Sequence, residues 1–333
     1  MREKFHFHDT PLTLEVSGLD INRLPYLSEL LTDFWWDPYD GPLPPQLHIE
    51  ISTDFPPCPF IQSIASPSHS VKMKRGVSLT FSESKALIQL GETHGQVDFH
   101  HGRCQIFLDS GFFERSPNQR SEFWMPVLIS LLQSRETFMM HAAGLVSPAG
   151  EGVIFVATSG SGKSTLTLGL IREGWSYLSD DVLFLRILDS TVEAFAGRRT
   201  FYVVGERVDC YRDWPLGEDN CPDRDGNARQ EILVRQRFPD QFLSDCHPRV
   251  LVLPQIVRQP TSQLIRLDRG AAIKDLLRES SIGLTGQQIL PGQLAVISRL
   301  VGQCQVYRLE SGEDLHHHPE LFANLLDNQS VST

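Results

Sequence analysis

The sequence predicts an α/β protein whose first part is rich in β-strands, and three observations support this fold class. Residues 1–115 contain short runs of alternating apolar and polar side chains between Gly, Pro and Asp, a pattern typical of strands. From Phe138 onwards, apolar strand-like runs alternate with helical patterns, which indicates an α/β domain. Within this second part, a loop of small residues at 157–162 joins a strand to a helix. We therefore expect a β-rich α+β domain over residues 1–115 and an α/β domain over residues 116–333.

In the first domain, the expected strands are the alternating runs at residues 12–16, 47–51, 77–81, 86–90 and 104–108. A helix is expected over residues 121–133, because apolar side chains recur there every three or four residues and Ser121 is a suitable N-cap. This helix would connect the two domains. The first domain would recognise a substrate or a partner.

In the second domain, the pattern predicts strands at 139–146 and 152–156, followed by a helix over 163–172. Further strands are expected at residues 175–179, 182–187, 250–253 and 304–309, and further helices at 271–278, 291–301 and 319–326. This alternation is what makes the second part an α/β domain.

The composition argues against several functions. The net charge of -11 at pH 7 disfavours non-specific binding to nucleic acid or to an anionic membrane. The 6 cysteines are scattered without a C-x-x-C pair, so neither a zinc ribbon nor a disulfide framework is expected. The chain begins without an apolar signal segment and has no apolar run of about 18 residues, which favours a cytoplasmic protein.

The loop before the helix has the pattern of a phosphate-binding P-loop. From Ala157 to Ser164 it reads Ala-Thr-Ser-Gly-Ser-Gly-Lys-Ser, with Ala where the first Gly is usual. Glycines let backbone N–H groups surround a polyphosphate, and the N-terminus of the following helix attracts negative charge. Lys163 would contact the terminal phosphates, and the Ser164 hydroxyl would bind Mg²⁺. The expected nucleotide-binding residues of the loop are Ser159, Gly160, Ser161, Gly162, Lys163, Ser164 and Thr165.

Two adjacent carboxylates, Asp180 and Asp181, follow the next expected strand. There they would lie near the bound phosphates, where one would hold Mg²⁺ and the other would accept a proton from an attacking hydroxyl. A solvated turn with two aspartates is the plainer alternative. His141, on the strand before the loop strand, is either a buried core histidine or a partner of this pair.

Together these segments resemble the HPr serine kinase/phosphorylase family. The resemblance rests on His141-Ala-Ala-Gly, on the loop at 157–164 and on Gly174-Trp-Ser-Tyr-Leu-Ser-Asp-Asp181. It implies a PEP-carboxykinase-like P-loop fold that binds ATP and Mg²⁺ and transfers the γ-phosphate to a serine hydroxyl. The acidic-x-Arg-Gly signature of true HPr kinase/phosphorylases is absent, and residues 1–115 do not resemble the first domain of that family. The acceptor therefore stays open.

The same resemblance implies a role for each matching residue. Lys163 binds the phosphates, Ser164 binds magnesium, and Asp180 is the general base with His141 beside it. Asp181 is a second metal ligand, although the order of roles within the pair stays open. The resemblance also suggests a homo-oligomer.

A kinase needs positive charge on the transferred phosphoryl group beyond Lys163. Arg235 is the favoured candidate, because it ends an apolar run that would hold it rigidly. The other arginines of this irregular stretch are Arg198, Arg199, Arg229 and Arg237.

The sequence thus predicts an ATP-dependent kinase that acts on a serine or other hydroxyl of a protein, a peptide or a small molecule. The alternative is an ATP-binding regulatory or assembly protein without phosphotransfer, in which ATP controls a contact made by residues 1–115. Simple ATP hydrolysis is less favoured, because no glutamate is evidently placed to orient a water molecule. Neither nucleic acid nor a membrane is an expected partner.

Overall fold

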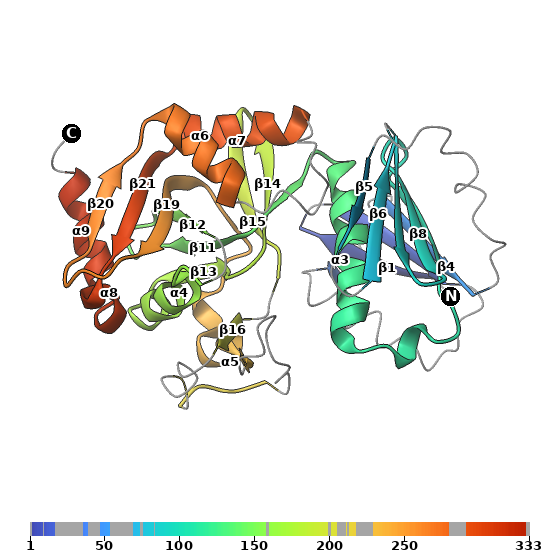
Figure 1. Ribbon diagram of the computed structural model, residues 1–333, viewed down its shortest axis with the longest axis horizontal. Coiled ribbons are helices and arrows are strands. Elements are labelled where there is room, and N and C mark those ends of the chain that lie inside the picture. Colours follow the sequence, from blue (N-terminus) through green and yellow to red (C-terminus); the bar gives the residue numbers. More distant parts are fainter. Residues whose placement is uncertain are drawn as a thin grey trace. The chain divides into compact units, whose positions relative to one another are not determined.

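The structure is a computed structural model, which describes residues 2–8, 10–16, 36–38, 47–53, 69–73, 76–82, 84–157, 160–198, 201–204, 211, 213–217, 229–279 and 291–330. It is a mixed α/β protein with several sheets (Figure 1). The chain forms two compact units. Unit 1 comprises Met1–Phe138 and Ile282–Gln293, and unit 2 comprises Met139–Ser281 and Leu294–Thr333.

Unit 1 contains a nine-stranded sheet with the strand order β3-β1-β2-β4-β9-β8-β7-β6-β5. Alternate side chains of β4 are buried, as expected for strands with one face on a core. The predicted β-rich character of this region is confirmed. The strands are β1 (Arg2–Phe7), β2 (Thr10–Val16), β3 (Trp36–Pro38), β4 (Leu47–Ser52), β5 (His69–Lys72), β6 (Val77–Phe81), β7 (Lys85–Leu90), β8 (Thr93–Asp98) and β9 (Arg103–Phe107).

The helix α3 (Pro117–Gln133) packs against β7, β8 and β9 and so belongs to unit 1. It begins before the predicted Ser121, because Ser116 is the N-cap and forms a reciprocal capping box with Gln119. Pro126 consequently lies inside the helix. The contacts thus put α3 ahead of the boundary between the units, whereas the sequence pattern assigned it to the second domain.

Unit 2 is built on a six-stranded sheet with the order β13-β11-β12-β19-β21-β20. A four-stranded sheet, β10-β14-β15-β18, and the pair β16-β17 complete its strands among the described residues. The strands are β10 (Phe138–Met140), β11 (Ala142–Val146), β12 (Gly152–Val156), β13 (Ser176–Ser179), β14 (Leu183–Leu188), β15 (Thr191–Ala196), β16 (Phe201–Val204), β17 (Arg229–Ile232), β18 (Asp245–Cys246), β19 (Pro248–Ile256), β20 (Gln263–Arg266) and β21 (Gln305–Ser311).

The strand predicted at 139–146 is in fact two strands. The chain leaves one sheet after β10 and enters another at β11, and His141 lies at the break. The hydrogen bond that His141 makes to Asp181 holds its side chain outside both sheets. The predicted loop strand and the helix after it are confirmed as β12 and α4 (Lys163–Arg172).

Strand directions bring several loops to one edge of the six-stranded sheet. β12, β19 and β21 are mutually parallel, and β11 runs antiparallel to both β12 and β13. The ends of β12, β13, β19 and β21 therefore meet the start of β11. We call this side the carboxyl edge, formed by residues 141, 157, 160–162, 180–181, 256–257 and 311–313.

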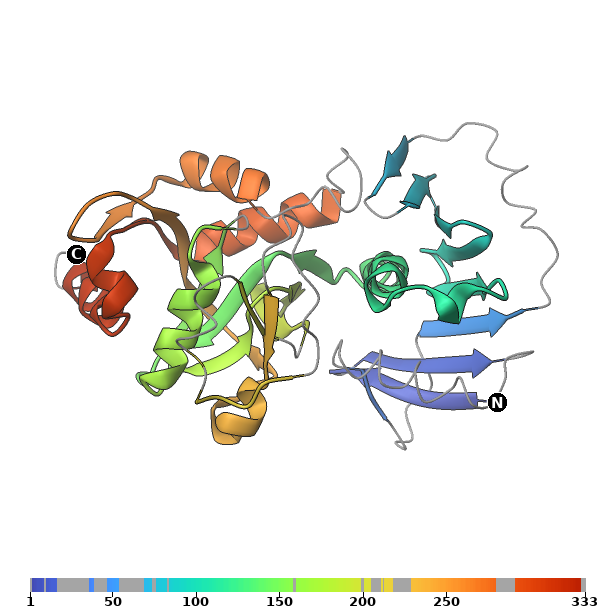
Figure 2. The same ribbon diagram turned by 60° about the horizontal axis from the view of Figure 1, so that its bottom comes forward.

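Helices cover both faces of this sheet. Figures 1 and 2 show α6 and α7 on one side and α4, α8 and α9 on the other. Phe322 of α9 packs against Phe155 of β12, with ring centroids 5.2 Å apart, and Arg308 of β21 binds Asp275 of α6 at 3.0 Å on the opposite face. Among the described residues, no helix is both long and apolar enough to cross a membrane. The remaining helices are α5 (Val234–Arg237), α6 (Arg269–Glu279), α7 (Pro291–Gln303), α8 (Glu313–His317) and α9 (Leu321–Ser330).

At Gly152, the first residue of β12, the backbone packs closely against the chain before β19. A Cβ atom on Gly152 would lie 2.4 Å from the backbone oxygen of His247, so Gly152→Ala should lower the free energy of unfolding by about 1–3 kcal/mol. Gly302→Ala is the matched control, because no atom lies within 4 Å of its added Cβ and alanine favours a helix by about 0.5–1 kcal/mol. Urea unfolding measures the free energy of unfolding of both variants. Equal stability of the two variants would contradict the close contact between Gly152 and His247.

Candidate functional site

The loop after β12 turns sharply into α4 at two glycines. Gly160 and Gly162 have φ angles of 86° and 87°, a left-handed conformation that costs other residues about 1–2 kcal/mol. Ala157 is not among the described residues with positive φ, which explains why alanine is accepted there. The first intrahelical hydrogen bond runs from the Leu166 N–H to the Gly162 carbonyl at 3.0 Å. The earlier N–H groups of α4 therefore face the loop, as at any helix N-terminus.

Lys163 links the first turn of α4 to the end of β13. The residue is 6% exposed, and its ammonium donates a hydrogen bond to the backbone carbonyl of Asp180. The same nitrogen lies 4.0 Å from Asp180 Oδ1. The structure thus brings together two residues that the sequence predicted to share a site.

The carboxylate of Asp180 is buried and only partly satisfied. The residue is 3% exposed, and its side chain is hydrogen-bonded to Ser164. Burial raises the pKa of Asp180 above its usual value, although the Lys163 ammonium and the Ser164 hydroxyl act in the opposite direction. Asp180 Oδ1 and Ser161 Oγ are both buried without a hydrogen-bond partner among the described residues. Unsatisfied oxygens of this kind are unusual in a core and typical of a site that receives a cation or a polar ligand.

Asp181 is paired with His141 instead of Lys163. The His141 Nδ1 atom lies 2.9 Å from Asp181 Oδ1 and 2.9 Å from the Asp181 backbone oxygen. Both partners are acceptors, so Nδ1 carries a proton. Burial disfavours the charged form of Asp181, but the hydrogen bond and charge of His141, with Lys163 and Arg198, outweigh it and hold its pKa far below the usual value. The Asp181 side chain nevertheless keeps 37% exposure, so solvent can reach it.

Two arginines of the irregular stretch can be placed in the structure. Arg198 is close enough to lower the pKa of Asp181, and its backbone carbonyl accepts a 2.9 Å hydrogen bond from Ser179. Arg235 lies over the Phe242 ring, 5.2 Å from its centroid. Arg198 follows β15, which pairs with the preceding strand β14, and the Gly197 N–H donates a 3.0 Å hydrogen bond to the Val182 carbonyl beside Asp181. No local pattern distinguished Arg198 from the other arginines of this stretch. The role proposed for Arg235 stays a prediction, and Ser159 lies outside the described residues.

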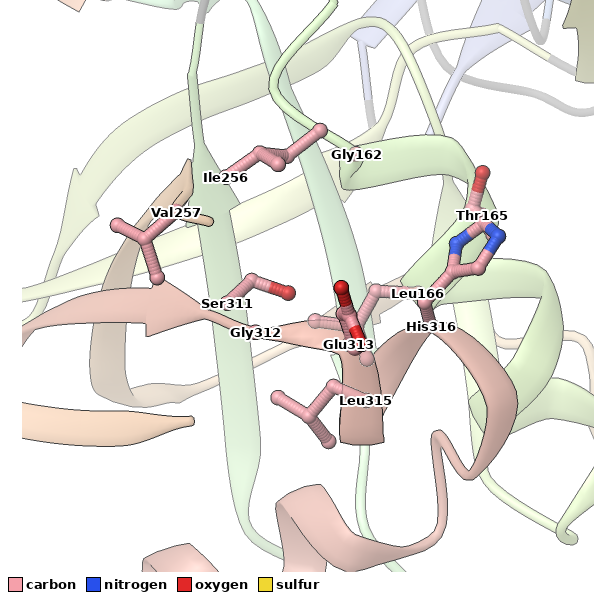
Figure 3. A pocket seen from close by; sticks show the side chains of 10 residues that line it. All are labelled: Gly162, Thr165, Leu166, Ile256, Val257, Ser311, Gly312, Glu313, Leu315 and His316. Atoms are coloured by element: carbon pink, nitrogen blue, oxygen red, sulfur yellow. The ribbon is translucent and has the colours of Figure 1, made fainter. Parts of the chain in front are cut away.

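A cavity of about 150 Å³ opens at the carboxyl edge on the other side of the loop. Gly162 and Thr165 contribute to it from the loop and α4, and the rest of its lining follows β19 and β21. Figure 3 shows Ile256 and Val257 on one side of this cavity and Leu166 on the other. The sequence did not indicate the cavity, because the segments that follow β19 and β21 carry no motif.

The oxygen atoms beside the loop fit a magnesium ion. The Ser164 hydroxyl and the two carboxylates are hard donors, and Asp180 Oδ1 is an orphaned acceptor. Among the described residues, no group of three or more His, Cys, Asp or Glu side chains is arranged to hold a metal. A Mg²⁺ ion that is bound with a nucleotide needs no such group, because phosphate and water supply most of its ligands.

No protein-family model matches the chain, and no curated protein sequence matches it. Among solved structures, the chain is similar to the HPr(Ser) kinase/phosphatase from Coxiella burnetii, with 16% sequence identity and a TM-score of 0.33. The superposition covers 58% of this chain and 97% of that chain. A likeness at this level assigns no family, so the chemistry of the site rests on its own residues.

The pairing of His141 with Asp181 gives a direct test. His141→Phe removes a hydrogen bond and a positive charge from Asp181, so the pKa of this carboxyl should rise toward its usual value of 3.8. Carbon-13 NMR of labelled aspartate across a pH series measures the change. His101→Phe, which removes the hydrogen bond to Asp98, is the control and should leave the Asp181 titration unaltered. An unchanged pKa in His141→Phe would contradict the pairing.

Proposed function

We propose that this chain is an ATP-dependent phosphotransferase that transfers the γ-phosphate, with Mg²⁺, to a serine or other hydroxyl. One observation carries the proposal: the glycine loop, Lys163 and the Asp180–Asp181 pair meet at the carboxyl edge of one sheet. A loop with a lysine suits polyphosphate binding, and a neighbouring carboxylate pair supplies the groups that phosphoryl transfer needs. The expected architecture is a P-loop domain of the HPr-kinase and PEP-carboxykinase type.

In this proposal, the loop and α4 bind the phosphates. Backbone N–H groups at the α4 N-terminus and around Gly160 and Gly162 donate to phosphate oxygens. The Lys163 ammonium, which donates to the Asp180 carbonyl in this structure, would donate to the terminal phosphates instead. Its charge then stabilises the negative charge of the transferred group.

The contacts favour a definite order of roles within the Asp pair. Asp180 is buried beside Lys163 and Ser164, so we assign it to the magnesium side of the site. Asp181 is more exposed and is held by His141, so we assign it as the group that accepts the proton of the acceptor hydroxyl. This order is the reverse of the one that the family resemblance implies. The raised pKa of Asp180 would make it the stronger base. A base must, however, lie within hydrogen-bond reach of the acceptor hydroxyl, and we give this geometric requirement more weight than the pKa.

The reaction then balances as follows. The acceptor oxygen forms a bond to the γ-phosphorus, the bond from that phosphorus to the bridging oxygen breaks, and ADP leaves. The hydroxyl proton passes to the Asp181 carboxylate, which His141 orients. Mg²⁺ supplies charge neutralisation on the phosphate oxygens when it is bound. Because such transfers are largely dissociative, orienting the hydroxyl matters more than the basicity of Asp181.

Transfer of radiolabelled γ-phosphate to a serine-peptide array and a panel of small hydroxyl compounds tests the function. Lys163→Ala should reduce transfer by about 100-fold or more, because it removes the charge on the migrating group. Lys274→Ala, which changes an exposed lysine of α6, should leave transfer unchanged. Tight ATP binding with no transfer to any acceptor would favour the regulatory alternative.

The order within the Asp pair needs a separate measurement. Asp181→Asn should lower transfer by about 10²–10⁴-fold at any Mg²⁺ concentration, because it removes the proton acceptor. Asp180→Asn should instead raise the Mg²⁺ concentration required for half-maximal transfer. Asp240→Asn, in an exposed turn, should change neither. A normal Mg²⁺ requirement in Asp180→Asn together with a raised one in Asp181→Asn would restore the opposite order.

A further inference from the structure

We infer that the cavity between the loop, β19 and α8 binds the base of the nucleotide, and that Glu313 selects a base with an amino group, such as adenine. The inference rests on the proposed function, because a nucleotide bound at the loop is its starting point. It assigns residues beyond the loop and the Asp pair to substrate recognition.

The position of the cavity follows from the strand order. β12 and its loop lie between β11 and β13 on one flank and β19 and β21 on the other. His141 and the Asp pair occupy the first flank, and the cavity occupies the second. In a nucleoside triphosphate, the phosphate chain separates the transferred phosphoryl group from the base. A triphosphate in the loop with its γ-phosphate toward Asp181 therefore directs its nucleoside toward the cavity.

The walls of the cavity suit a flat, apolar ring. Ile256 and Val257 form one side, and Leu166 and Leu315 contribute from α4 and α8 (Figure 3). Ile256 is 51% exposed, so its side chain is accessible to a ligand in the cavity. Its side chain lies over the loop, 3.5 Å from where a Cβ on Gly162 would stand. Sites for small molecules combine apolar walls of this kind with a few polar groups.

Four polar side chains line the cavity: Thr165 of α4, Ser311 at the end of β21, and Glu313 and His316 of α8. Among these four, Glu313 is the carboxylate. An ionised carboxylate only accepts hydrogen bonds, so Glu313 would bind the exocyclic amino group of adenine. The same charge repels phosphate, which favours the base end of the nucleotide as the occupant.

A hydrogen-bond network fixes the elements that carry these groups. The Asp314 carboxylate accepts bonds from the Ser262 N–H at 2.9 Å and the Leu315 N–H at 2.7 Å, and it binds the Ser262 hydroxyl at 2.5 Å. The Ser262 hydroxyl also accepts a 2.8 Å hydrogen bond from the Gly312 N–H. The chain after β19 is thus tied to the start of α8. The cavity is held open before ligand arrives, which reduces the entropy lost on binding.

Calorimetric titration of the full chain with MgATP, MgITP and magnesium tripolyphosphate separates base binding from phosphate binding. Ile256→Ser should weaken ATP about tenfold through lost apolar contact and change tripolyphosphate binding less than about twofold. Ile265→Ser, which alters another exposed isoleucine outside the cavity, should change neither ligand. Glu313→Gln should reduce the preference for ATP over ITP, because inosine lacks the amino group.

Ser311→Trp, which fills the cavity, should abolish the advantage of ATP over tripolyphosphate. If Ser311→Trp does not fold, Ile256→Ser and Glu313→Gln still test the inference. Both change exposed side chains, so these variants should fold. Equal affinity of the wild type for ATP and tripolyphosphate would overturn the inference, as would unaltered ATP binding in Ile256→Ser. Either result leaves the proposed function intact. A wild type that binds neither ligand would remove the proposed function itself, and the inference with it.

Discussion

The hydrogen bond from the Lys163 ammonium to the Asp180 carbonyl joins the first residue of a helix to the end of a strand. Because the lysine is buried, its charge must be satisfied by nearby oxygen atoms, and Asp180 supplies both a carbonyl and a carboxylate. This bond fixes the backbone at the turn that follows β13. At this turn, the Asp180 side chain is buried and the Asp181 side chain is partly exposed to solvent.

The second constraint is the direction of the strands. β11 runs opposite to β12, so its first residues lie beside the last residues of β12, as the pairing of Ala142 with Val156 shows. His141 therefore reaches the carboxyl edge, although it precedes the loop by many residues. The parallel strands β19 and β21 end at the same edge, where Ile256 pairs with Ser311. One edge of one sheet thus gathers groups from five separate segments, as is common for ligand sites in α/β folds.

These two constraints divide the carboxyl edge by chemistry. The flank near β13 is charged and polar, with a buried carboxylate beside Lys163 and an accessible carboxylate beside His141. The flank near β21 is mainly apolar and holds the cavity beside the loop. The proposed transfer from a nucleotide would use both environments, with fixed charges at the reacting phosphate and apolar contact at the nucleoside. The loop between the two flanks is short, so Lys163 contacts Asp180 on one flank and Gly162 lines the cavity on the other.

The sequence alone determined the local elements of this protein. The loop, the helix that starts at Lys163 and the strand before it follow from residue patterns within a few positions of one another, which is why they were predictable. The tertiary structure decided what depends on distant pairing. It broke the strand at His141 and joined that residue to Asp181 across 40 positions. It also brought the ends of β19 and β21, which are far apart in the sequence, together at the cavity. Such contacts arise from strand order and register, which short-range patterns do not encode.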